Sequence, residues 1–135
     1  MKKQTVPFGD VMGMEVALSN TISVDMTDSA RMVWVSGQVA FDEHGEIVGK
    51  GNIRIQTEQS IKNIASALKE VGGTLDDVVN LTVFVKEMDD LSEINKMRLK
   101  YFNKPYPTST TVQISDFVLP DILIEIDAQA VISIK

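Results

Sequence analysis

The chain has 135 residues, a formal net charge of −6 and no cysteine. Its length predicts one domain over residues 1–135, and its composition excludes disulfide bonds and thiolate metal sites. The acidic balance argues against nucleic-acid binding, which needs clustered basic side chains, and no apolar run approaches the roughly 20 residues of a membrane span.

The first half of the chain carries strand and turn signals. Residues 15–20 could form a short strand, and residues 27–29 form a turn signal of small polar residues. The β-branched and aromatic run at residues 32–36 predicts a buried strand that ends at Gly37. The apolar segments on either side of a turn at residues 42–45 predict a hairpin over residues 39–48.

The middle of the chain predicts two helices around a strand. Residues 57–71 place apolar side chains at helical spacing, and the two glycines that follow end this helix. Residues 78–86 alternate as a strand. We expect Asp89 and Asp90 to cap a second helix that two prolines, Pro105 and Pro107, bring to an end.

Two further strands follow, at residues 108–115 and 122–134. In the last strand every even-numbered residue is apolar, whereas Glu125, Asp127 and Gln129 are polar. Successive side chains of a strand point to opposite faces, so one face packs under helices and the other carries polar groups. The order of elements predicts an α+β fold, a mixed sheet with two helices on one face.

The opposite face of this sheet is expected to be only half polar. Leu123, Val131 and either Trp34 or Val35 would lie there among polar side chains with nothing from the same chain to cover them. Such a face is better buried against another copy, and closed cyclic symmetry is the usual arrangement. The sequence therefore predicts a homo-oligomer.

Many short motifs occur in the order in which they occur in the RidA/YjgF family, and the chain resembles that family over about residues 32–131. The motifs are VSGQ at 35–38, GEIVG at 45–49, QTEQ at 56–59, LDDVV at 75–79, TVFV at 82–85, MDDL at 88–91, TV at 111–112 and IEIDAQAV at 124–131.

The resemblance implies a chorismate-mutase-like fold assembled as a homotrimer, with the sheets lining a central barrel and three clefts between subunits. In its best-known branch the family hydrolyses reactive 2-imino acids and their enamine tautomers to 2-keto acids and ammonia, without a cofactor. An arginine grips the substrate carboxylate, a glutamate on the last strand orients the water, and a tyrosine near the N-terminus closes the pocket.

By resemblance the catalytic glutamate falls on Glu125, and substrate-binding positions fall on Asn95 and Ser36. We expect Glu125, Asn95, Ser109 and Thr111 to line one cleft between subunits. No metal site is expected, because the chain has only one histidine and no cysteine.

Two of the family's pocket residues are missing. Ser109 occupies the arginine position, and Ser23 lies near the tyrosine position. A serine hydroxyl cannot replace a bidentate guanidinium, so a carboxylate would need Arg31, Arg54 or Arg98 from another strand or subunit.

Three functions remain open, and the sequence leaves undecided whether the protein is an enzyme. The first is a homotrimer whose clefts bind a small metabolite such as a carboxylate, with little or no deaminase activity. The second is an active cofactor-free deaminase of imino or enamine acids that uses Glu125. The third, a ribonuclease or translation inhibitor, is disfavoured by the acidic charge. The expected partners are other copies and a small molecule, not nucleic acid or a membrane, and the expected location is the cytoplasm.

Overall fold

The computed structural model describes residues 3–10 and 13–134. Over these residues strands, helices and short 3-10 turns alternate along the chain. In order they are β1 (Lys3–Pro7), β2 (Ser19–Thr27), β3 (Ala30–Gln38), α1 (Ile53–Glu70), η1 (Leu75–Asp77), β4 (Val78–Val85), η2 (Met88–Asp90), α2 (Leu91–Tyr101), β5 (Thr108–Gln113) and β6 (Ile124–Ser133).

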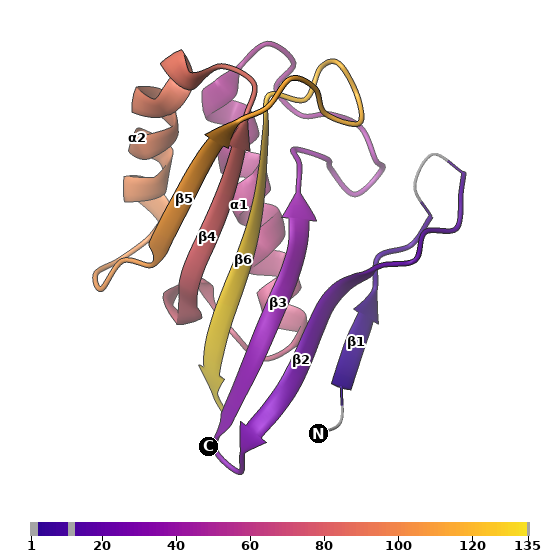
Figure 1. Ribbon diagram of the computed structural model, residues 1–135, viewed down its shortest axis with the longest axis vertical. Helices are drawn as coiled ribbons and strands as arrows, with labels where there is room; N and C mark the ends of the chain where they lie inside the picture. The colour runs from indigo at the N-terminus through magenta and orange to yellow at the C-terminus, as the bar shows by residue number, and fades with distance from the viewer. Residues whose placement is uncertain (1–2, 11–12, 135) are drawn as a thin grey trace.

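The strands form one mixed sheet with the order β1-β2-β3-β6-β4-β5 (Figure 1). The last strand, β6, lies in the middle, antiparallel to both β3 and β4. Only β4 and β5 run parallel, and α2 makes the crossover between them. The predicted α+β class, with a mixed sheet, is confirmed.

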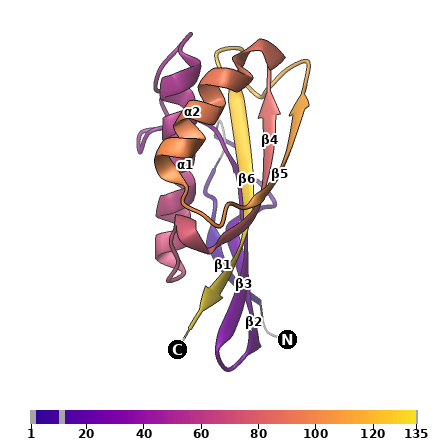
Figure 2. The ribbon, with the colours of Figure 1, turned by 90° about the vertical axis from the view of Figure 1, so that its left-hand side faces the viewer.

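Helices α1 and α2 lie on one face of the sheet (Figure 2). No helix of the described residues covers the other face, which we call the bare face. The strand residues that point to the helices form the core. They include Val33 and Val35 of β3, Leu81, Val83 and Val85 of β4, and the even-numbered residues from Ile124 to Ile132 of β6, all at most 5% exposed. The even-numbered residues of β6 therefore face the helices, as the alternation of apolar and polar residues in the sequence predicted.

Helix α1 packs an apolar stripe onto β3 and β6, with Ile61, Ile64 and Leu68 fully buried. It begins at Ile53, one turn before the predicted start, because the Asn52 side chain accepts a hydrogen bond from the backbone of Ile55 and caps the helix. The predicted end at the glycine pair is correct to within one residue.

Four local predictions need correction. Strand β1 was not predicted, and the strand expected at residues 15–20 begins only at Ser19. Residues 39–48 form a single bridge, Phe41 to Ile47, and no regular hairpin. The carboxylate of Asp90 makes no capping hydrogen bond at the start of α2, where η2 leads straight into the helix.

Candidate functional site

The bare face of the sheet carries a mixture of polar and apolar side chains. Across the middle strands Trp34, Gln129 and Asn80 lie side by side in one row. Trp34 is 38% exposed and Val131 is 42% exposed, although both lie in the middle of a regular sheet. The expectation that one of residues 34 and 35 lies on this face is met by Trp34, because Val35 is buried under the helices.

Glu125 lies on this bare face, next to a break in the neighbouring strand. Ser36 and Gly37 form a β-bulge, since Val35 pairs with Ala128 whereas Gln38 already pairs with Ile126. A Cβ atom at position 37 would lie 2.6 Å from Oε2 of Glu125. The missing side chain of Gly37 is therefore the space that the carboxylate occupies.

The Glu125 carboxyl is half-buried and accepts no hydrogen bond from the described residues. Burial raises its pKa above the ordinary value, and the negative charge of Asp127, two residues along the same face, raises it further. A carboxyl of this kind is held partly desolvated without a partner, which is typical of a functional group rather than a structural one.

A hollow of about 430 Å³ opens on the same face, with Ser36, Gly37, Trp34 and Asp127 in its wall. Glu125 does not line this hollow itself, but its neighbours Gly37 and Asp127 do. The Ser36 hydroxyl donates a hydrogen bond of 2.7 Å to the backbone oxygen of Ser19, which ties the bulge to β2. Ser36 thus positions the loop that makes room for Glu125.

The remaining predicted site residues lie elsewhere in the chain. Ser109 pairs with Leu81, so Ser109 and Thr111 point to the helix side of β5, the face opposite Glu125. Asn95 lies on α2, also on the helix side. One chain does not bring these residues to Glu125, and only a neighbouring copy could do so. The shared cleft stays a prediction.

The three arginines differ in what they contact. Arg31 donates to Asp25 at 2.7 Å and to the backbone oxygen of Val71. Arg54 forms an ion pair with Glu93 at 3.1 Å. Arg98 makes no side-chain hydrogen bond or ion pair with any described residue. Of the three, Arg98 alone keeps its guanidinium uncommitted within residues 3–10 and 13–134.

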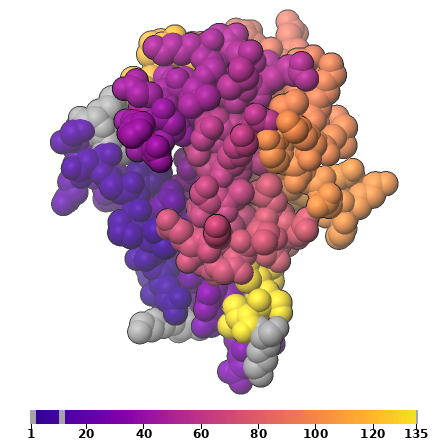
Figure 3. Space-filling view, turned by 180° about the vertical axis from the view of Figure 1, so that it is seen from behind, coloured from indigo at the N-terminus to yellow at the C-terminus, as the bar shows by residue number. Residues whose placement is uncertain are grey.

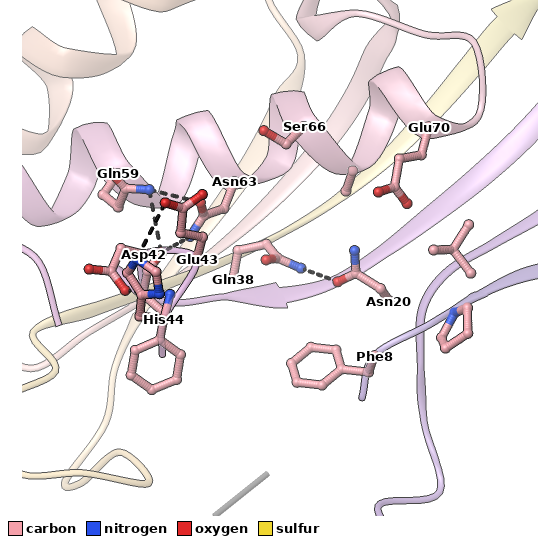
Figure 4. A pocket seen from close by; sticks show the side chains of 14 residues that line it. Phe8, Asn20, Gln38, Asp42, Glu43, His44, Gln59, Asn63, Ser66 and Glu70 are labelled. Carbon is pink, nitrogen blue, oxygen red and sulfur yellow. Dashed lines mark hydrogen bonds and ion pairs between the residues drawn. The ribbon is translucent and has the colours of Figure 1, made fainter. Parts of the chain in front are cut away.

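A larger cavity of about 620 Å³ lies on the helix side, between α1 and the N-terminal strands (Figure 4); Figure 3 shows these strands beside α1 from behind. Its amides bind one another: Gln59 donates to Asn63 at 2.9 Å, and Gln38 donates to Asn20 at 2.9 Å. Asn63 also donates to the backbone oxygens of Val39 and Phe41. Each of these four side chains makes at least one hydrogen bond within the chain, and Asn63 holds the loop before α1 in place.

Two further features of the described residues concern metal ions and membrane spans. They contain no group of three or more acidic or histidine side chains arranged to hold a metal ion. None of the described helices is long and apolar enough to cross a membrane. The lone His44 lies in the exposed turn after Asp42, as expected.

Gly37 was not identified from the sequence as a site residue. The only signal was its place in the VSGQ motif, at the end of a strongly predicted strand. A glycine there can simply end a strand, so its role beside Glu125 depends on the pairing of β3 with β6.

Comparison with known proteins agrees with this architecture. The model of the endoribonuclease L-PSP family matches residues 15–132. A RutC family protein of Pyrococcus abyssi is 42% identical over 100 residues, which are 73% of this chain and 76% of the relative. The 3-aminoacrylate deaminase RutC of Acinetobacter baylyi is 34% identical over 107 residues, 79% of this chain and 84% of that protein.

A solved structure, TdcF of E. coli with bound serine, superimposes with a TM-score of 0.74 at 28% identity and covers 96% of this chain and 94% of its own. The predicted chorismate-mutase-like fold is thereby confirmed. With a family model covering most of the chain and relatives above 40% identity, the chain belongs to the endoribonuclease L-PSP family, which is the RidA/YjgF family.

Proposed function

We propose that this protein is a homotrimer whose clefts between subunits bind a small metabolite, and that imine or enamine hydrolysis is a slow activity of the same clefts. The observation that carries the proposal is Glu125, a half-buried carboxyl without a hydrogen-bond donor on a face that the chain leaves bare.

The assembly accounts for the bare face. Trp34 and Val131 keep about two fifths of their surface exposed, at 38% and 42%, in the middle strands of the sheet. Burying apolar surface is worth about 25 cal/mol per Å², so a second copy that covers this face stabilises the assembly. Closed symmetry also buries the same face on every copy. A copy laid against this face would complete the hollow next to Glu125.

Glu125 has the properties of a general base for water. Its raised pKa brings it closer to neutral pH, where a base transfers protons most effectively. No donor among residues 3–10 and 13–134 binds its carboxylate oxygens. No cofactor is required for such a step, because the acid-base group and water suffice.

Ser109 makes the hydrolysis slow in this proposal. The resemblance places there the arginine that grips the substrate carboxylate, and a hydroxyl supplies neither the charge nor the second donor. Losing a positioned charge contact costs about 2–5 kcal/mol of transition-state stabilisation, or roughly 30- to several-thousand-fold in rate.

The decisive experiment measures hydrolysis of 2-iminobutanoate, generated in situ from threonine by a dehydratase. We expect wild-type protein to act barely above background. Ser109→Arg should raise the rate by roughly 30-fold or more, and adding Glu125→Gln should abolish that gain. Wild-type hydrolysis as fast as that of an arginine-bearing relative would contradict the proposal, because it would require another cation in the cleft.

A second function, a fully active deaminase of enamine acids, is favoured by the raised pKa of Glu125 together with the likeness to the 3-aminoacrylate deaminase of Acinetobacter baylyi. The test is the same assay with 3-aminoacrylate as substrate. Fast turnover that Glu125→Gln removes would establish this function instead. Ribonuclease activity is not proposed, because the net charge of −6 opposes the binding of a polyphosphate chain.

A further inference from the structure

A small cavity on the helix layer is built around the uncommitted arginine. It has a volume of about 190 Å³ and is lined by Asn95, Arg98, Leu99, Phe102, Tyr106 and Pro107. Four of these belong to α2 and its C-cap, and two belong to the loop that leads into β5. The cavity thus lies where the helix turns back towards the sheet.

The charge of Arg98 is only partly hydrated in this position. The residue is half-buried, and burial lowers the pKa of its guanidinium. The guanidinium contacts no carboxylate, carbonyl or hydroxyl acceptor among the described residues. Since arginine stays protonated in proteins, it cannot escape this cost by losing its charge. A half-buried cation of this kind is stabilised by any anion that reaches it.

The rest of the wall determines which anion fits. Asn95 lies one helical turn before Arg98, and residues three apart share a face of a helix, so its amide can donate beside the guanidinium. Phe102 is 6% exposed and, with Leu99 and Pro107, gives the cavity an apolar side. The volume corresponds to about six water molecules. These features fit an anionic head group that carries a short carbon chain.

We infer that this cavity binds a small aliphatic carboxylate, with the carboxylate on Arg98 and Asn95 and the carbon chain against Leu99, Phe102 and Pro107. A planar guanidinium matches a carboxylate with two parallel hydrogen bonds, which fixes the ligand's orientation. This cavity shares Asn95 with the cleft predicted between subunits, but the inference does not rest on the proposed hydrolysis, because Glu125 lies on the opposite face of the sheet and takes no part in this cavity.

The test titrates the full-length protein with butanoate and, as a neutral isostere, with butanamide, and follows backbone amide signals by NMR. Butanoate should shift the signals of Asn95, Leu99 and Phe102, and butanamide should bind at least tenfold more weakly. Arg98→Gln should weaken butanoate binding by tenfold or more, and Arg98→Lys should weaken it less, because a lysine keeps the charge but not the fork.

Two controls separate this site from others. Arg54→Gln removes the same charge from an exposed arginine that pairs with Glu93, and it should leave butanoate binding unchanged. Glu125→Gln should also leave it unchanged, so failure of the proposed hydrolysis and failure of this site can be told apart. Arg98→Gln should not lower the melting temperature, since it removes an unpaired charge.

Unchanged binding by Arg98→Gln, or equal affinity for butanoate and butanamide, would overturn the inference. So would shifts confined to the Glu125 face. Phosphate that binds as tightly as butanoate would show a general anion site and would overturn the assignment to carboxylates.

Discussion

The cavity of Figure 4 and the hollow beside Glu125 are both lined by polar side chains, yet the two regions treat them differently. In the first, Asn63, Gln59, Gln38 and Asn20 all find hydrogen-bond partners within the chain. Close to the second, Glu125 accepts no hydrogen bond from the described residues, and its pKa is raised. Buried polar groups are normally satisfied, so an unsatisfied carboxyl on an uncovered face favours the second region as the functional one. The larger volume of the first cavity does not by itself point to a function.

The largest expected effect is a change of oligomeric state when a positive charge is placed on the bare face, and the same charge at the cavity of Figure 4 serves as the control. Val131→Arg puts a cation in the middle of the bare face, where the proposed assembly has no water to hydrate it. We expect light scattering to show the mass falling from three times 14.9 kDa to that of a single chain. Ser66→Arg, at an exposed position on the wall of the other cavity, should leave the mass unchanged. A wild-type protein of 14.9 kDa would already contradict the trimer.

The next effect tests whether the amides of the Figure 4 cavity are structural. Asn63→Ala removes donors to the backbone oxygens of Val39 and Phe41, each at 2.9 Å. We expect the free energy of unfolding to fall by about 1–2 kcal/mol in a urea titration, with hydrolysis and binding by the folded protein unchanged. Ser66→Ala on the same helix serves as the control. A loss of ligand binding without a loss of stability would assign this cavity a function instead.

A smaller effect concerns the pH dependence of stability. Because the folded-state pKa of Glu125 is raised, the folded protein binds a proton there more tightly than the unfolded chain does. This tighter proton binding stabilises the folded state fully at pH values below the pKa of Glu125 in the unfolded chain. The stabilisation is lost as the pH rises through the pKa of Glu125 in the folded protein. Glu125→Gln should therefore raise the free energy of unfolding at pH 8 by about 1 kcal/mol or less, since the group is only half-buried, and the melting temperature should rise with it. The gain should shrink as the pH falls to 4. A variant that melts lower than wild type at pH 8 would mean that the ionised carboxylate has a stabilising partner.

Gly37→Ala is expected to change the stability least, but it should change the pKa of Glu125. The added Cβ meets Oε2 of Glu125 at 2.6 Å and its Cδ at 2.8 Å, so the end of the glutamate side chain has to move outwards. We expect the pKa of Glu125, followed by carbon NMR of the carboxyl group, to fall towards its ordinary value. Ser66→Ala changes an exposed residue of α1, on the helix side of the sheet, and should leave that pKa unchanged. If Gly37→Ala leaves it unchanged as well, burial by this bulge is not the cause of the shift.

The spacing of apolar residues predicted the structure correctly where it alone determines which face of a strand or helix is buried. The alternation through residues 122–134 placed Glu125 on the face away from the helices, and the helical spacing at residues 57–71 located most of α1. Both signals are strong because one face of each element is buried along its whole length. Strand β1 gave no such signal, because Lys3–Pro7 is an edge strand, mostly exposed and formed only by pairing with β2.

The hairpin predicted over residues 39–48 forms only in part. Phe41 bridges Ile47, and backbone hydrogen bonds from Asp42 to Glu46 and from Val48 to Ala40 flank that bridge. The segment does not continue as a ladder, and the side chain of Asn63, more than 20 residues away, donates to the backbone oxygens of Val39 and Phe41. Such a long-range contact cannot be read from the local pattern.

The sequence by itself determined the fold class and the family resemblance, because each depends on residue types read in order. From the resemblance it also predicts that Ser109 takes the arginine position, and strand alternation places Ser109 and Thr111 on one face. Only the tertiary structure decided that this face is the helix side, opposite Glu125, since the parallel pairing of β5 with β4 sets it. The tertiary structure alone also showed that the Glu125 carboxylate occupies the space beside Gly37, and that the Arg98 guanidinium has no partner among the described residues. Alternation fixes which residues point together, but the direction in which they point depends on the register and the neighbours that folding brings to each strand.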